Sequence, residues 1–199
     1  MLIIYLVLSY LIGSIPFGFL IAYFVKHINI RDFGSGNIGA TNVWRVVGKR
    51  WGVFTFILDF LKGFFPLLFA KFLFPQCAVF TIVLIAIAPI CGHNWTPFLK
   101  FKGGKGVAPS LGAMSGLSFI FPLIGVALLF SLLAWIMVFV VFKYVSLASL
   151  SAGAVFFICA LILSLPKEVK FLSLCLFVFI LVRHKKNIKG LLTKKEYHF

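Results

Sequence analysis

Long runs of apolar residues, separated by short polar connections, follow one another along almost the whole of this 199-residue chain. A helix rises about 1.5 Å per residue, so about 20 apolar residues cross a hydrocarbon layer about 30 Å thick. Hydrophobic residues make up 62% of the chain and charged residues only 12%, which is more apolar material than a water-soluble core of this size can bury. The sequence therefore predicts an all-α polytopic membrane protein, with residues 1–199 forming a single membrane-embedded domain.

Seven of the apolar runs are predicted to be transmembrane helices. The first has no basic residue before Lys26, which indicates a retained helix and not a cleaved signal peptide. The fourth, VAPSLGAMSGL, is so short that a re-entrant helix is an alternative on hydropathy alone. The predicted spans are residues 2–25, 52–71, 77–92, 107–117, 118–142, 146–165 and 169–182.

The basic residues predict the orientation of these spans. Fifteen of the 19 Lys and Arg residues lie in four alternate connections, at 26–50, 100–105, 143 and 183–195. The positive-inside rule assigns such connections to the cytoplasm, and this alternation requires the fourth span to cross. We therefore expect the N-terminus outside, the C-terminus in the cytoplasm, and a multi-pass protein of the plasma (inner) membrane.

The sequence GSGNIGATNVWR at 34–45 is a polar, glycine-rich loop in this apolar chain. Glycines allow close approach of the backbone to a ligand, and the Ser, Asn and Thr residues offer hydrogen-bond donors to an anion. Arg45 adds a planar fork that fits phosphate. Although the loop contains G-x-G-x-x-G, it lacks the preceding strand and the later acidic residue of a dinucleotide site. A phosphate site is therefore predicted here.

Two more polar segments, GHNWTPFLKFKGGKG at 92–106 and RHKKNI at 183–188, are predicted to lie on the same cytoplasmic face. Topology explains their lysines, but it does not explain the GGKG sequence or Asn187. Lys105 is followed by Gly106 and not by Ser or Thr, so GGKG is not a Walker sequence. We expect the three segments to form one anion-binding site that faces the cytoplasm.

Two other polar pairs receive different interpretations. Asp59 and Lys62 lie three residues apart on one predicted transmembrane helix, where mutual neutralisation gives a structural explanation. His27 and Asp32 have the H-x-x-x-x-D spacing of many glycerolipid acyltransferases, in which the His is a general base. The rest of that signature is missing, so we interpret this spacing as coincidental and keep it as the runner-up catalytic site.

The three loop motifs, together with ILDFLKGFFP at 57–66 and KYVSLASL at 143–150, resemble in order and spacing the bacterial acyl-phosphate:glycerol-3-phosphate acyltransferase family. The resemblance implies a seven-helix membrane enzyme that transfers an acyl group from acyl phosphate to the 1-hydroxyl of glycerol 3-phosphate. The products would be lysophosphatidic acid and phosphate, in the first acylation of phospholipid synthesis. We expect a monomer among membrane lipids, although the residues themselves do not specify an oligomeric state, and no cofactor, metal or nucleic acid is expected.

The same resemblance implies the site residues. The catalytic residues would be Thr41, Lys105, Ser146, His184 and Asn187. The substrate and its phosphate would be bound by Ser35, Gly36, Asn37, Gly39, Asn42, Arg45, His93, Gly103 and Gly104. His184 and a substrate phosphate are both candidates for the proton acceptor. The chain departs from the family pattern at Pro109, Gly190 and Lys194, although it retains Glu196. These departures leave the contribution of the C-terminal tail to substrate binding open.

Two other functions remain as alternatives. A membrane acyltransferase that takes acyl-CoA or acyl carrier protein would have a similar sequence, because the residues do not identify the acyl donor. A transporter of a phosphorylated small molecule would also bind anions. Transport is disfavoured, because transporters place polar groups near the bilayer midplane and the predicted spans carry few charges besides Asp59 and Lys62.

Overall fold

The computed structural model describes residues 1–198, which form ten α-helices and two short 3-10 helices. The first six α-helices are α1 (Leu2–Ser14), α2 (Phe17–Lys26), α3 (Ala40–Val46), α4 (Lys49–Leu73), α5 (Val79–Asn94) and α6 (Val107–Ser118). The other four are α7 (Leu123–Phe142), α8 (Val145–Ile162), α9 (Lys167–Arg183) and α10 (Lys185–Leu192). The 3-10 helices are η1 (Ile30–Asp32) and η2 (Pro97–Leu99).

The prediction of an all-helical membrane protein is confirmed. Five segments of the described chain are long and apolar enough to cross a membrane: Leu2–Lys26, Lys49–Leu73, Val79–Leu99, Leu123–Phe142 and Val145–Ile162. Helix α6 has 12 residues and α9 has 17, and at about 1.5 Å per residue α6 is only about 18 Å long. The predicted span 118–142 begins too early, because α6 ends at Ser118 and a turn with Pro122 precedes α7.

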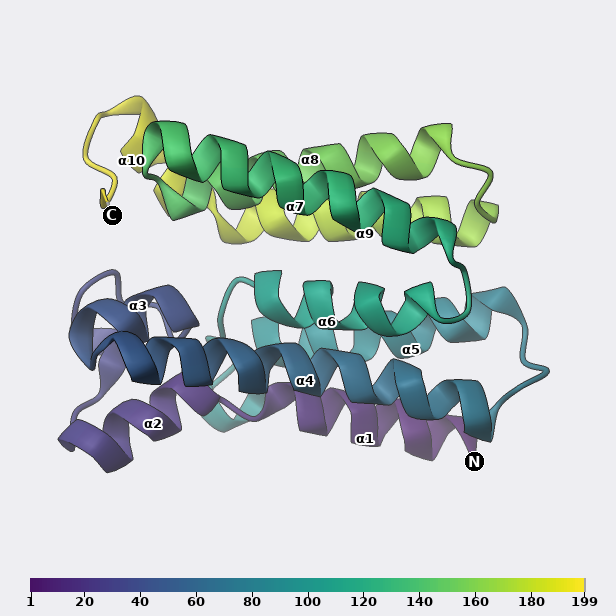
Figure 1. Ribbon diagram of the computed structural model, residues 1–199. Coiled ribbons are helices and arrows are strands. Elements are labelled where there is room, and N and C mark those ends of the chain that lie inside the picture. Colours follow the sequence, from purple (N-terminus) through teal and green to yellow (C-terminus); the bar gives the residue numbers. More distant parts are fainter. Residues whose placement is uncertain (199) are drawn as a thin grey trace.

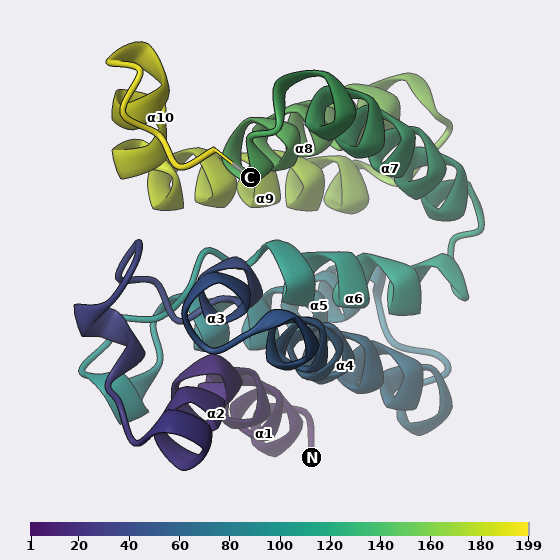
Figure 2. The same ribbon diagram turned by 60° about the vertical axis from the view of Figure 1, so that its left-hand side comes forward.

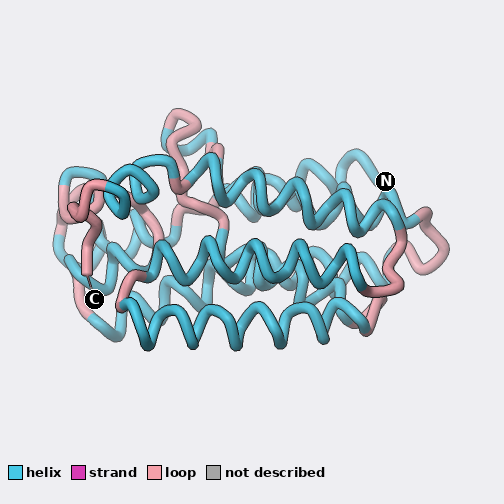
Figure 3. The backbone as a smooth tube through the Cα atoms, turned by 90° about the horizontal axis from the view of Figure 1, so that it is seen from above, coloured by secondary structure: helices cyan, strands magenta, loops and turns pink. Residues whose placement is uncertain are grey.

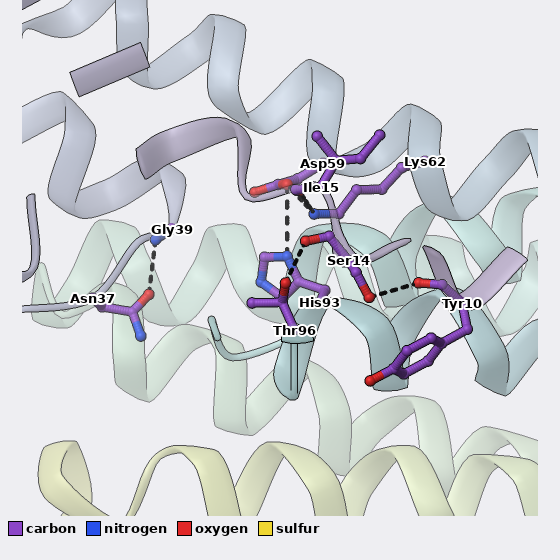
Figure 4. A network of polar contacts seen from close by, with 9 residues as sticks. All are labelled: Tyr10, Ser14, Ile15, Asn37, Gly39, Asp59, Lys62, His93 and Thr96. Carbon is purple, nitrogen blue, oxygen red and sulfur yellow. Dashed lines mark hydrogen bonds and ion pairs between the residues drawn. The ribbon is translucent and has the colours of Figure 1, made fainter. Parts of the chain in front are cut away.

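The first predicted span is broken into α1 and α2 at Ile15 and Pro16. Proline has no backbone N–H, so carbonyl groups near it need other donors. The Ser14 carbonyl accepts a hydrogen bond from Thr96 Oγ1 at 2.6 Å, and the Ile15 carbonyl accepts one from Lys62 Nζ at 2.8 Å (Figure 4). The break is therefore held by side chains of α4 and of the loop after α5.

The helices form two groups that lie face to face (Figures 1 and 2). Helices α1 to α6 form one group and α7 to α10 the other, and residues 119–122 connect them. Within the first group α6 packs closely against α4, because α6 carries Gly112 and Gly116 at the contact. A methyl group on Gly112 would overlap the Phe60 carbonyl oxygen, and one on Gly116 would lie 2.7 Å from Leu67 Cβ. This small-residue packing is typical of membrane helices.

The two ends of the bundle differ. One end, here called the polar end, consists of residues 27–48, 95–106, 143–144 and 184–198. Figures 1 and 3 show the described end of the tail there and the N-terminus at the opposite end. The largest core cluster, which includes Leu67, Ile85, Leu117, Ile124 and Leu172, joins the two helix groups away from the polar end. Tight packing therefore fills one end of the molecule, and the space between the groups opens toward the other.

Candidate active site

A cavity of about 550 Å³ lies between the two helix groups. Its lining combines side chains of the three predicted polar segments with apolar side chains of α4, α6, α7, α8 and α9. Eleven of the fourteen predicted site residues line it: Ser35, Asn37, Gly39, Thr41, Asn42, Arg45, His93, Lys105, Ser146, His184 and Asn187. Gly36, Gly103 and Gly104 do not. The fold therefore brings residues from the first quarter of the chain beside residues near its end.

The glycine-rich loop is organised by Asn42, which is buried in the first turn of α3. Its side-chain oxygen accepts a hydrogen bond from the Ser35 N–H at 2.9 Å. Its Nδ2 donates to the carbonyls of Ile30, Phe33 and Asn37 at 3.3, 3.0 and 2.9 Å. The amide group of Asn42 is thus used within the loop, so its contribution to a ligand is to hold Ser35 at the cavity wall.

The loop between α5 and α6, residues 95–106, is fixed by its own backbone and by Arg183. The N–H groups of Gly103 and Gly104 donate to the carbonyls of Asn94 and His93 at 3.2 and 3.0 Å. The Arg183 guanidinium donates to the carbonyls of the same two glycines, at 2.7 and 2.8 Å. A side chain on Gly104 would collide with the His93 ring. The prediction that Gly103 and Gly104 contact phosphate is therefore not supported, because their amides are occupied; they position Lys105.

Lys105 follows these glycines and lies among other charges at the polar end. Burial lowers its pKa to about 8, the negative charge of Glu196 raises it, and the positive charges of Arg45 and Arg183 lower it further. A cation in such a place gains most when an anion enters beside it. Lys105 and Arg45 therefore form the positive side of the cavity.

His184 connects α9 to α10 and is buried. Its Nδ1 lies 2.8 Å from the Ile180 carbonyl oxygen, which can only accept, so Nδ1 carries the hydrogen and Nε2 has the lone pair. Burial and the positive charge of Lys105 lower the pKa of His184 to about 4. The imidazole is therefore neutral at pH 7 and offers an acceptor at Nε2.

The C-terminal tail returns to the site through Glu196 and Tyr197. Glu196 Oε1 accepts hydrogen bonds from Ser146 Oγ at 2.9 Å and from Asn187 Nδ2 at 2.6 Å. The Tyr197 hydroxyl donates to the Gly34 carbonyl at 3.0 Å, and the Arg45 guanidinium lies 4.8 Å from the centre of the Tyr197 ring. The tail thus joins α10 to the glycine-rich loop across the polar end, which sequence reasoning had left open.

Asp59, Lys62 and His93 form a buried polar cluster on the wall of the cavity (Figure 4). Asp59 Oδ1 lies 2.7 Å from Lys62 Nζ and 3.6 Å from His93 Nδ1. Asp59 and His93 both line the cavity. Asp59 and Lys62 therefore neutralise each other, as expected for a structural ion pair. Asp59 also lies beside His93 on the cavity wall.

Sequence reasoning assigned no role to Arg183 or Tyr197. Arg183 lies in a cluster of basic residues that the positive-inside rule already explains, so nothing in the sequence indicated a specific role for it. The runner-up pair lies elsewhere: His27 ends α2 and Asp32 lies in η1, and both side chains are exposed outside the cavity lining. The structure therefore places His27 and Asp32 outside the cavity that the three polar segments line.

Comparisons with known proteins agree over the whole chain. The family model described as glycerol-3-phosphate acyltransferase matches residues 3–194. The glycerol-3-phosphate acyltransferase of Aquifex aeolicus (strain VF5) is 42% identical over 193 residues, which cover 97% of this chain and 96% of the relative. That of Wolbachia pipientis subsp. Culex pipiens (strain wPip) is 42% identical over 196 residues, covering 98% and 97%.

Solved structures are similar as well. The crystal structure of PlsY (YgiH), an integral membrane glycerol 3-phosphate acyltransferase, matches in its glycerol 3-phosphate form with a TM-score of 0.90 and 40% identity. Its lysophosphatidic acid form matches with a TM-score of 0.86 and 39% identity. Each match covers 100% of this chain and 95% of the solved chain. The chain therefore belongs to the glycerol-3-phosphate acyltransferase family, and it is an integral membrane acyltransferase.

Proposed function

We propose that this enzyme transfers a fatty acyl group from acyl phosphate to the 1-hydroxyl of glycerol 3-phosphate, giving lysophosphatidic acid and phosphate. One observation carries the proposal: Arg45, Lys105, Ser146, His184 and Asn187 meet at the polar end of a cavity that continues between apolar helix faces. Such a cavity suits a reaction between a small phosphate ester and an acyl chain. The solved relatives, described in glycerol 3-phosphate and lysophosphatidic acid forms, support the acceptor and the product.

The acceptor phosphate would bind between the two loops. Arg45 provides a fork for two phosphate oxygens, and Lys105 provides a point charge from the opposite loop. Ser35 and Thr41 add hydroxyl groups from the glycine-rich loop, and Asn187 adds the amide hydrogen that it does not donate to Glu196. Ser146 would donate to the substrate by exchanging its hydrogen bond to Glu196. The glycerol hydroxyls would then face the acyl donor near His184.

The chemistry needs no covalent enzyme intermediate. Acyl phosphate is a mixed anhydride, so the glycerol O1 attacks the acyl carbon directly, and the bond from that carbon to the phosphate oxygen breaks. The enzyme supplies orientation and stabilises negative charge on the carbonyl and leaving phosphate oxygens. The O1 proton must also leave. With a pKa of about 4, His184 is a weak base and suits a hydrogen-bond acceptor that orients the hydroxyl, which favours a substrate phosphate as the final proton acceptor.

We further propose seven membrane crossings, with the N-terminus outside and the site facing the cytoplasm of the inner membrane. The N-terminus and the described end of the tail lie at opposite ends of the bundle, which supports an odd number (Figure 1). The polar end carries 11 of the 19 basic residues, and Lys26, Lys49, Arg50 and Arg183 directly flank it, so the positive-inside rule orients it toward the cytoplasm. We also propose a single-domain enzyme that acts as a monomer, because one cavity within the chain gathers eleven of the fourteen predicted site residues.

Offering three donors in parallel tests the proposed function. Purified protein is incubated with glycerol 3-phosphate and with palmitoyl phosphate, palmitoyl-CoA or palmitoyl acyl carrier protein. We expect lysophosphatidic acid only from palmitoyl phosphate. Equal or faster turnover of a thioester donor would contradict the proposed donor. Uptake of glycerol 3-phosphate into proteoliposomes without acylation would instead support a transporter.

Topology can be tested with engineered single cysteines. A membrane-impermeant thiol reagent applied to intact cells should label a cysteine placed at Lys71, in the last turn of α4, or at Lys167, which begins α9. It should not label one at Lys102 or Lys189, which lie at the polar end. The reason is that the reagent reaches only the outer side of the membrane. Permeabilised cells provide the control, since all four positions should then react. Labelling at Lys189 in intact cells would mean an even number of crossings.

The lowered pKa of Lys105 predicts a pH dependence of substrate capture. Lys105 is charged below pH about 8 and neutral above it, whereas the substrate phosphate is already close to fully charged above pH about 7. We therefore expect kcat/KM for glycerol 3-phosphate, which reports the free enzyme, to fall as pH rises above about 8, by up to about tenfold per pH unit. Lys105→Arg, which stays charged, should lack this fall. A wild-type profile flat to pH 10 would contradict the assignment.

A further inference from the structure

The cavity continues away from the polar end as an apolar slot between the two helix groups. Each helix lines the slot with residues three or four positions apart, which lie on one face of a helix. On α8 these residues are Ser146, Ser149, Gly153 and Phe156. Faces of α6, α7 and α9 complete the walls. The slot is thus built from regular helix faces. Its depth therefore follows from the number of residues along each helix and the rise of about 1.5 Å per residue.

Three serine hydroxyl groups along the slot, those of Ser131, Ser149 and Ser173, donate hydrogen bonds within their own helices. Ser131 Oγ donates to the Ala127 carbonyl at 2.7 Å, and Ser149 Oγ donates to the Val145 carbonyl at 2.8 Å. Ser173 does the same with the Lys170 carbonyl at 2.7 Å. Hydroxyls bonded back to their own helix present little polarity to a neighbour. A hydrocarbon chain therefore meets a wall without unpaired donors from these serines.

On α6, α7 and α8 the lining of the slot ends at Met114, Leu128 and Phe156, and on α9 it reaches Ser173. One turn farther from the polar end, the same helix faces carry Leu117, Ile124 and Ala160, each with no exposed surface. These residues belong to the packed core cluster, as Phe156 itself does. Close-packed cores leave no room for a further chain. Phe156, only 7% exposed, is the large side chain of α8 at the boundary between slot and core.

The depth of the slot matches one leaflet of a membrane. Phe156 lies ten residues beyond Ser146 on α8, a distance of about 15 Å along the helix axis. The hydrocarbon core of a bilayer is about 30 Å thick, so one leaflet is about 15 Å deep. An acyl chain whose carbonyl lies near Ser146 would therefore reach Phe156 at about the depth that a phospholipid chain, which is not fully extended, spans in a fluid leaflet.

We propose that Phe156 sets the longest acyl chain that this enzyme transfers efficiently. This inference rests on the proposed function, because the slot then holds the donor's acyl chain. Gly153, one turn nearer the polar end, keeps the slot open. A Cβ there would lie 3.0 Å from Ile180 Cδ1 and 3.6 Å from Phe177 Cδ2, so a larger side chain would narrow the slot. The two positions thus predict opposite changes of chain-length preference.

The test measures kcat/KM for lauroyl, myristoyl, palmitoyl, stearoyl and arachidoyl phosphate. In Phe156→Ala the ratio of arachidoyl to palmitoyl transfer should rise about tenfold, the scale on which a pocket discriminates methylene groups. In Gly153→Val the ratio of palmitoyl to lauroyl transfer should fall by about the same factor. Ratios within one variant cancel differences in the folded fraction. Ile158→Ala, two residues farther along α8, 52% exposed and outside the cavity lining, is the matched control and should keep the wild-type ratios.

Unchanged ratios in both Phe156→Ala and Gly153→Val would overturn the proposal. So would the same shift in Ile158→Ala, since the effect would then come from the helix and not from the slot. If Phe156→Ala does not fold, Phe156→Leu should shift the ratio in the same direction by a smaller factor. If the wild type uses only thioester donors, the proposed acyl phosphate donor fails, and the same graded series of acyl-CoA donors still tests Phe156.

Discussion

Lys105→Ala should lower kcat/KM for glycerol 3-phosphate by about 10²- to 10³-fold, the range found when one preorganised charge-stabilising group is removed from an active site. Lys105 is partly buried and lies within electrostatic range of Glu196, Arg45 and Arg183. Without Lys105, the substrate phosphate would be neutralised from one side only, by Arg45. Lys105→Arg should retain part of the activity, because the guanidinium keeps the positive charge but is planar and larger than the ammonium group. The measurement is steady-state acyl transfer in detergent at pH 7.

Lys102→Ala is the matched control for this change. Lys102 lies three residues earlier in the same loop, its side chain is exposed, and it makes the same contribution to the positive-inside balance. Both variants should therefore insert in the membrane equally well and elute as the wild type does. If Lys102→Ala were as inactive as Lys105→Ala, the loop would act as a general positive surface. Near-normal activity of Lys105→Ala would refute its assignment to the substrate phosphate.

Much of the fold could be predicted because the membrane imposes a strong pattern. Helices need long apolar runs to cross a bilayer, so α4, α5 and α8 begin and end within three residues of their predicted bounds. The prediction failed where local turn chemistry matters. Pro122 delays the start of α7, and the break at Pro16 divides the first span into α1 and α2. Hydropathy averages over such single residues.

The members of the site could be predicted better than their roles. Residue types and order indicated which segments meet, but hydrogen-bond partners depend on the fold. Asn42 looks like a ligand residue in sequence, whereas its amide is used to hold the loop. Arg183 looks like a topology residue, whereas it fixes the carbonyls of Gly103 and Gly104. In both cases the tertiary contact decides whether a polar group is available to a substrate.

The tail was the least predictable part of the site. Glu196 lies 50 residues from Ser146 in sequence, and the two are joined by a hydrogen bond of 2.9 Å. The chain reverses after α10, where Lys194 adopts the left-handed region with φ 54°. Short reversals of this kind have no apolar periodicity to reveal them. The departures from the family pattern at Gly190 and Lys194 thus lie in a tail that still delivers Glu196 to the site.

Replacing His27 should have little effect, whereas replacing Asn187 should be severe, and this pair of results separates the two catalytic interpretations. His27 is exposed and ends α2 with φ 55°, a conformation that Asn tolerates, so His27→Asn removes the imidazole without strain. If His27 were the general base, this variant would lose about 10²- to 10⁴-fold in kcat. Since His27 lies outside the cavity lining, we expect less than about a twofold change, the scale of a neutral surface substitution.

Asn187→Ala removes a donor that lies 2.6 Å from Glu196 and lines the cavity between α10 and α8. We expect a loss of about 10²-fold or more in kcat/KM, because the substrate loses a positioned donor and the Glu196 carboxylate loses the partner that restrains it. Thr41→Ala, on the opposite wall, should also be impaired, which would place the chemistry between the two walls. All three variants are assayed with palmitoyl phosphate. An inactive His27→Asn that still inserts and elutes as the wild type does, beside active Asn187→Ala and Thr41→Ala, would instead favour the H-x-x-x-x-D dyad.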